Sequence, residues 1–196
     1  MKRLCLAVLL LLFGGCERTV TRFSPPAPGG IEFFPLQVGN QWTYELQHDS
    51  TFQMVVRIVD STRIGSHLYF AFEQNYAMSS LADTTFYRTE GDTRVFVNRG
   101  EGDKLYIDFG RPTGKSWPSE NGVATIREKN GTRVVKAGEF TRTISIDFDP
   151  APMAIDDEHS DTFAPEVGRI EMVGQIGRLQ LVSAWVNGKA YPSKTR

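Results

Sequence analysis

Over most of its length the chain alternates apolar and polar residues with a period close to two. Trp42, Tyr44 and Leu46 fall on one face of an extended segment. Thr43 and Glu45 fall on the other, because successive side chains of a strand point to opposite faces. The pattern recurs, rich in β-branched and aromatic residues, at 55–59, 69–73, 86–88, 94–98, 105–109, 124–127, 133–135, 141–148, 169–173 and 179–182. We therefore predict about ten or eleven short strands, with Trp42 and Tyr44 in the core.

Turn residues separate these segments at short intervals. Gly91 interrupts one pair of strands, and two Asn-Gly pairs follow, Asn130-Gly131 and Asn187-Gly188. Asn-Gly favours a two-residue hairpin turn, because both positions take a positive φ. Strands joined by hairpins usually pair with each other, and a large sheet must curl or fold onto itself. The pattern predicts an all-β domain: one antiparallel, largely meander sheet of about ten strands, strongly curved or barrel-like, with a two-sheet sandwich as the alternative.

The N-terminus has a different pattern. Lys2 and Arg3 precede an uninterrupted apolar run over residues 4–13. A run of about ten residues spans roughly 15 Å as a helix, half the thickness of a bilayer core. That length is typical of a secretory signal and too short for a permanent transmembrane helix. We predict a signal peptide over residues 1–15.

The end of this signal, Phe13-Gly14-Gly15-Cys16, resembles the lipobox of bacterial lipoproteins. The resemblance implies that Cys16 carries the lipid and anchors the protein to a membrane of the bacterial cell envelope. Phe13 departs from the pattern, which usually has Leu there. The alternatives are a plain secretory signal with an incidental cysteine and a cytoplasmic hydrophobic N-terminus. Glu17 follows the cysteine, whereas enteric inner-membrane lipoproteins carry Asp, so the resemblance favours the outer membrane over the inner membrane.

Proline and glycine dominate the segment between Cys16 and the first strand. Pro25, Pro26 and Pro28 lack a backbone donor, and two glycines follow them. We interpret residues 16–32 as the lipidated cysteine and a flexible tether. Residues 33–196 then form a single β domain, consistent with a chain of 196 residues.

Composition excludes some functions. The net charge of −1 becomes −3 when a signal containing Lys2 and Arg3 is removed, and no cluster of basic residues follows. We therefore expect no nucleic-acid partner, because phosphate binding needs clustered Lys and Arg. Cys5 and Cys16 are the only cysteines. The predicted domain thus has no disulfide, thiol nucleophile or cysteine-based zinc site.

Three stretches in order resemble a broad group of uncharacterised bacterial lipoproteins. They are an opening motif PLxxGNxWxY at 35–44, a strand, glycine turn and tryptophan within 105–117, and a closing stretch at 137–140 and 163–170 that contains APxVGxI. The resemblance implies a β domain on a lipid anchor and supplies no catalytic residues. The residues have a structural interpretation too. Gly39 and Asn40 suit a turn, Gly168 suits a positive φ or a close backbone approach, and Trp117 suits a plug at one end of the sheet.

The three histidines do not indicate a metal site. His48, His67 and His159 have no histidine partner at a zinc-ligand spacing. His48 and His67 fall at predicted strand ends or turns, where a solvated histidine is the ordinary interpretation. The sequence also lacks the G-x-S-x-G elbow of hydrolases and the phosphate-binding P-loop.

Six carboxylates concentrate near the C-terminal third of the chain: Asp147, Asp149, Asp156, Asp157, Glu158 and Asp161. Ca²⁺ takes six to eight oxygen ligands, so a weak calcium site is one interpretation. A solvated acidic loop and a set of catalytic carboxylates are the others. The spacing does not match the EF-hand loop, and no glycine makes its sharp turn.

We therefore expect a non-enzymatic envelope lipoprotein without a cofactor, which binds an apolar ligand or an envelope protein or serves envelope assembly. Thirteen phenylalanines could line a concave apolar face, or simply fill the core. The rival hypothesis is an envelope hydrolase that uses scattered carboxylates on a β scaffold. A cavity and its lining would distinguish the two.

Overall fold

The computed structural model describes residues 29–77, 82–120, 122–151 and 157–192. The regular elements of these ranges are all strands, and within them no helix is long and apolar enough to cross a membrane. The predicted signal peptide, Cys16 and the tether up to residue 28 lie outside the described residues.

Fifteen strands follow one another along the described chain. They are β1 (Gly29–Ile31), β2 (Phe34–Leu36), β3 (Gln41–Leu46), β4 (Asp49–Ile64), β5 (His67–Tyr76), β6 (Ala82–Glu90), β7 (Arg94–Asn98), β8 (Asp103–Asp108), β9 (Ser116–Ser119), β10 (Gly122–Val135), β11 (Gly138–Asp149), β12 (His159–Ala164), β13 (Gly168–Gly174), β14 (Gly177–Val186) and β15 (Lys189–Tyr191).

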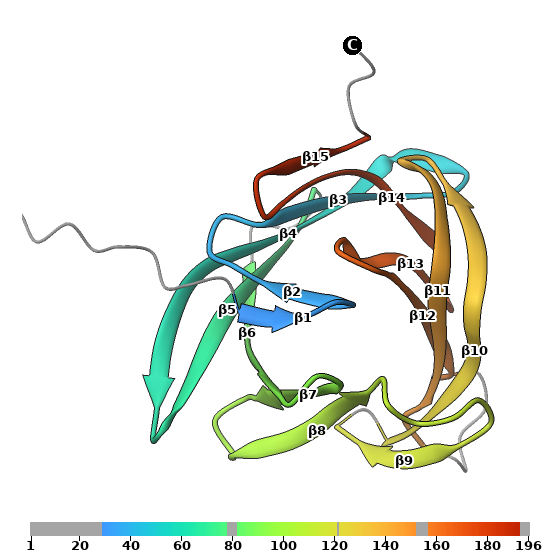
Figure 1. The fold of residues 1–196 in the computed structure, drawn as a ribbon. Coiled ribbons are helices and arrows are strands. Elements are labelled where there is room, and N and C mark those ends of the chain that lie inside the picture. Colours follow the sequence, from blue (N-terminus) through green and yellow to red (C-terminus); the bar gives the residue numbers. More distant parts are fainter. Residues whose placement is uncertain (1–28, 78–81, 121, 152–156, 193–196) are drawn as a thin grey trace, which may run out of the picture.

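Thirteen of these strands form one antiparallel sheet that curls into a nearly closed barrel (Figure 1). Strands β3 to β8 are successive neighbours, as are β9 to β14, and β3 pairs with β14. The ring is completed between β8 and β9, where the backbone N–H of Glu120 donates to the Leu105 carbonyl at 2.8 Å. The Ser119 hydroxyl donates to the Tyr106 carbonyl at 2.7 Å. The predicted barrel-like meander is confirmed, and the sandwich is excluded.

Two of the three predicted turns are confirmed. Gly91 lies in the turn between β6 and β7, and Asn187-Gly188 joins β14 to β15 with φ of 50° and 81°. The expected hairpin turn at Asn130-Gly131 is wrong. Asn130 does have a positive φ, 59°, but it lies inside β10 at a register shift. There the extra residue makes a β-bulge, which bends the strand instead of reversing it.

The barrel interior is the hydrophobic core. Trp42 and Tyr44 are 3% and 2% exposed, which confirms that they are core residues. The Trp42 ring stacks on Phe72 with centroids 6.0 Å apart. Bulges in β4, β10 and β13 increase the bend of the sheet, which lets a single layer of strands enclose this core.

The small hairpin β1–β2, which we call the plug, lies within one mouth of the barrel (Figure 1). Phe34 and Leu36 of the plug are buried in the core. The Glu166 N–H donates to the Glu32 carbonyl at 2.7 Å and ties the plug to the loop between β12 and β13. The sequence predicts that the domain begins at Phe33, but regular structure starts earlier, because β1 begins at Gly29.

Gly168 contacts the plug and satisfies both requirements inferred for it. Its φ is +90°, and a Cβ built there would lie 3.2 Å from Cδ of Pro35. Trp117, on β9, is 3% exposed and pairs across to Ala124. Trp117 is therefore a core residue on the strand next to the β8–β9 junction.

Candidate functional site: an aromatic cavity in the barrel

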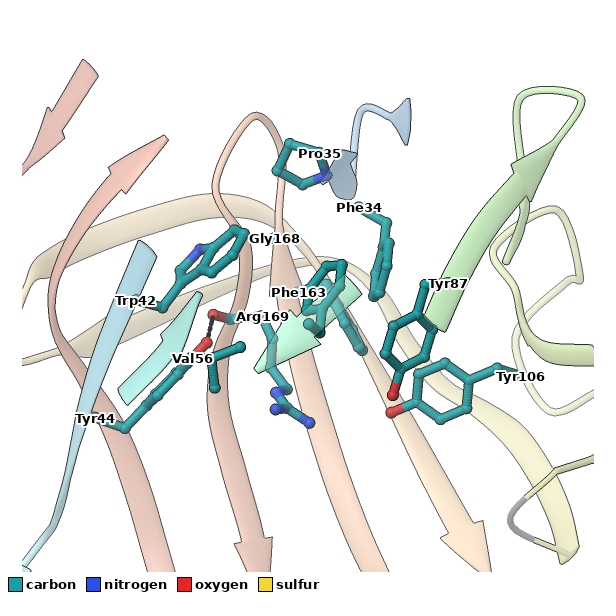
Figure 2. A pocket seen from close by; sticks show the side chains of 11 residues that line it. Phe34, Pro35, Trp42, Tyr44, Val56, Tyr87, Tyr106, Phe163, Gly168 and Arg169 are labelled. Atoms are coloured by element: carbon teal, nitrogen blue, oxygen red, sulfur yellow. Dashed lines mark hydrogen bonds between the residues drawn. The ribbon is translucent and has the colours of Figure 1, made fainter. Parts of the chain in front are cut away.

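A cavity of about 40 Å³ lies inside the barrel, directly beneath the plug (Figure 2). This volume holds a few water molecules at most, whereas ligand sites are usually ~300–1,000 Å³. Aromatic side chains supply most of its wall: Phe34, Trp42, Tyr44, Phe72, Tyr87, Tyr106 and Phe163.

Contacts among these rings fix the shape of the wall. Phe34 of the plug stacks near Phe72 with centroids 5.6 Å apart, and Phe72 meets Tyr87 edge-on at 4.9 Å. The indole N–H of Trp42 donates to the Val167 carbonyl at 2.6 Å. The wall is thus built from several strands, and the plug contributes one of its faces.

A charged side chain, Arg169, lines this aromatic cavity and forms an ion pair with Asp161. Nη1 of Arg169 is 3.1 Å from Oδ2 of Asp161, and the Tyr106 hydroxyl donates to the same oxygen at 3.4 Å. The Tyr44 hydroxyl donates to the Arg169 backbone carbonyl at 2.8 Å. The Arg169 side chain is 24% exposed and lines the cavity, whereas the Asp161 side chain is 2% exposed.

A bulge explains why Arg169 points inward. Asp161 pairs with Met172 and Thr162 pairs with Glu171, but Phe163 pairs with Arg169, which leaves Ile170 as an extra residue in β13. Strict alternation would put Arg169 and Glu171 on the same face. The extra residue breaks that alternation, so Glu171 meets Arg178 at 3.4 Å while Arg169 reaches Asp161. Sequence periodicity therefore missed Arg169, since an alternation pattern contains no signal for a bulge.

Burial controls the protonation of this site. It raises the pKa of Tyr44 to about 12 and raises the pKa of Tyr87. The pKa of Tyr106 lies well above its usual value because of burial and the nearby Asp161 carboxylate. Burial by itself lowers the pKa of Arg169, but Asp161 and the phenols Tyr44 and Tyr106 raise it well above the usual range. At neutral pH the cavity presents protonated phenols and a charged guanidinium.

These groups are suited to binding. The cavity wall contains hydrogen-bond donors and one cation within aromatic surface, an arrangement that orients a small molecule. The described lining has no serine, cysteine, lysine or histidine that could serve as an activated nucleophile or its base.

The predicted acidic residues divide between two places. Asp147, Asp149 and Glu158 line an open groove of about 460 Å³ over β10–β13, where Asp147 pairs with Arg127 at 3.3 Å. Asp161 instead faces the barrel interior.

Two members of the acidic set remain. Asp157 does not line it, and Asp156 lies outside the described residues. Within the described ranges no three histidine, cysteine or acidic side chains are placed to hold a metal ion. This arrangement gives no support to a calcium site or to a carboxylate hydrolase.

The histidines lie away from the cavity. His48 is exposed in the turn before β4, and His67 is exposed at the start of β5, as the sequence predicts. The ring of His159 stacks on Phe148 with centroids 4.9 Å apart, at the edge of the groove.

A solved structure is similar in fold. It is a Bacteroides fragilis protein assigned as exported and described as having a YmcC-like fold, and it superposes with a TM-score of 0.53. The two sequences are 14% identical, and the match covers 79% of this chain and 99% of the other. No protein-family model and no curated protein matches the sequence. The likeness establishes a shared barrel architecture.

Proposed function

We propose that this chain is a lipid-anchored protein of the bacterial cell envelope whose barrel binds a small ligand with an apolar body. The observation that carries the proposal is that Arg169, paired with Asp161, lines an aromatic cavity. Removing two charges from water is costly, and replacing a buried pair with apolar residues is often neutral or stabilising. A charged side chain at an aromatic cavity is therefore better explained by ligand binding than by stability.

The plug controls the space available to a ligand. Phe34 and Pro35 line the cavity, so a ligand larger than a few waters must take the place of these side chains. The plug is a short hairpin held to the rim by the Glu166–Glu32 backbone bond and the Arg142–Glu32 ion pair at 2.5 Å. A two-stranded hairpin is only marginally stable by itself. We therefore place the entry route at the plug, where a ligand would take the position of the Phe34 ring.

The anchor supports the same account. Cys16 is the residue that resembles a lipidation site, and it precedes Gly29 by thirteen positions along the chain (29 − 16 = 13). An extended chain of that length reaches about 45 Å, so a lipidated Cys16 would keep the plug close to the membrane. The plug end would then face the source of apolar molecules. Glu17 favours the outer membrane for this location.

A neutral fluorescent probe tests the binding function. N-phenyl-1-naphthylamine is titrated against the mature chain bearing Cys16→Ser, which removes the lipid. We expect saturable binding with one site. Phe34→Ala should bind more tightly, because it removes a ring from the cavity wall. Phe140→Ala is the matched control, since Phe140 contacts Tyr191 and does not line the cavity.

Absence of binding to both the parent chain and Phe34→Ala would refute a ligand site in the barrel. Equal effects of the Phe34 and Phe140 substitutions would place the probe elsewhere.

A further inference from the structure

We infer that the ligand is an anionic amphiphile, with a carboxylate, sulfonate or phosphate group held by Arg169 and an apolar body against the aromatic wall. This inference rests on the proposed function. It adds the chemical class of the ligand, which the cavity's apolar wall alone does not specify.

The first argument is that the positive member of the ion pair faces the cavity. The Arg169 side chain keeps 24% of its surface accessible and lines the cavity, while Asp161 keeps 2% and does not. A molecule that enters therefore meets the guanidinium before the carboxylate. A guanidinium offers donors in a planar fork that fits carboxylate and phosphate oxygens.

The second argument is the state of the neighbouring phenols. Tyr87 and Tyr106 direct their hydroxyl groups toward the cavity (Figure 2). Burial raises the pKa of both phenols, so each keeps its proton. The Tyr106 hydroxyl donates to Asp161, and the Tyr87 hydroxyl can donate to an anion. A cation beside such a donor is complementary to a negative group, and it disfavours a second cation.

The third argument concerns the ion pair itself. Arg169 and Asp161 are joined at 3.1 Å through one guanidinium nitrogen, Nη1. A guanidinium has five N–H donors, so a single contact to a carboxylate leaves room for a second acceptor. Asp161 thus holds Arg169 in place while other N–H groups of the guanidinium stay available. A ligand anion can bind these groups without displacing Asp161.

Two probes that share one ring system isolate the charge. 1-Anilinonaphthalene-8-sulfonate carries a sulfonate on the same framework as the neutral N-phenyl-1-naphthylamine. The quantity measured is the ratio of their dissociation constants for each variant of the chain. We expect the anionic probe to bind more tightly to the parent chain.

Two variants test the role of the ion pair. Asp161→Asn removes the competing carboxylate and should tighten anionic-probe binding about tenfold, the scale of one charge-assisted hydrogen bond, with the neutral probe unchanged. The double variant Arg169→Met with Asp161→Asn removes both charges together, so no unpaired charge remains buried. It should lose the preference for the anionic probe. Thermal unfolding of each variant confirms that it is folded.

The outcomes separate the two proposals. Two results would overturn the anionic class and leave the binding function standing. One is that the parent chain binds the anionic probe no more tightly than the neutral probe. The other is that the double variant still binds the anionic probe more tightly. Failure of both probes to bind would overturn the binding function and this inference with it.

Discussion

Trp42 shows how one residue joins the core to the candidate site. It is buried at 3% exposure, its indole N–H donates to Val167, and its ring lines the cavity. Truncating a buried tryptophan to alanine typically costs about 3–5 kcal/mol. We expect Trp42→Ala to lower the thermal midpoint sharply in the absence of any ligand. Trp185→Ala is the control, because Trp185 is 52% exposed and should change the midpoint little.

A melting temperature of Trp42→Ala equal to that of Trp185→Ala would show that Trp42 contributes to a surface and not to the core.

Buried tyrosines make the stability depend on alkaline pH. The pKa of Tyr44 is raised to about 12 by burial, and burial also raises the pKa of Tyr87 and Tyr106. Unfolded tyrosine titrates near pH 10. Because the folded state binds these protons more tightly, their stabilising contribution is complete below about pH 10 and is lost as pH rises toward 12.

Unfolding and phenol absorbance at 295 nm, followed together from pH 9 to 12.5, measure this effect. We expect the buried phenols to ionise with the cooperative unfolding transition. Ionisation of all tyrosines near pH 10 in a protein that stays folded would contradict the burial of these three side chains.

At the residue scale, the sequence predicts side chains on regular strands and misses those at irregularities. Trp42 and Tyr44 were assigned correctly to the core by alternation alone. Arg169 was not, because the bulge at Ile170 changes the face that it occupies. The composition of the cavity depends on such a local shift, and a shift of one residue leaves no trace in hydrophobic periodicity.

At the element scale, the plug depends on its contact with Gly168. A Cβ at this position would approach Cδ of Pro35 to 3.2 Å, and φ is +90°. Gly188 has a similar φ of +81° and no neighbour within 4 Å of a Cβ. Alanine at either position meets backbone strain of about 1–2 kcal/mol. We therefore expect Gly168→Ala to lower the free energy of unfolding more than Gly188→Ala does. The difference is the cost of the close contact between the new Cβ and Pro35 of the plug.

Denaturant unfolding of the two variants measures that difference. Equal destabilisation would mean that the plug moves aside freely and that Gly168 is needed only for its conformation.

Sequence patterns identify long elements better than short ones. The sequence predicts the strands of the main sheet that carry several alternations and misses β1, β2, β9, β12 and β15. β12 has six residues but is buried at five consecutive positions, so it shows no alternation. The other four strands are short. Three or four residues are too few to establish a period. The plug could not be predicted for a second reason: Gly29 and Gly30 are typical of a linker, and their pairing with Pro35 and Leu36 follows from burial of Phe34 in the barrel.

At the scale of the whole molecule, the proposed lipid anchor determines where the barrel acts. Cys16 follows two glycines, as in the lipobox that it resembles. We expect Cys16→Ser to move the protein from the membrane to the soluble fraction, since one cysteine is the proposed point of attachment. Cell fractionation without detergent checks this. A serine variant that stays with the membrane would refute lipid anchoring at Cys16.

The central claim, that a ligand occupies the inside of the barrel, is tested most directly by filling that space from within. Val56 lines the cavity, whereas its neighbour Val55 points to the other face of β4. Adding a ring to a packed interior costs about 1–3 kcal/mol, which a folded barrel tolerates. Binding of N-phenyl-1-naphthylamine should be lost in Val56→Phe and kept in Val55→Phe, with both variants shown to be folded by thermal unfolding. Equal binding by the two folded variants would contradict a ligand site in the barrel.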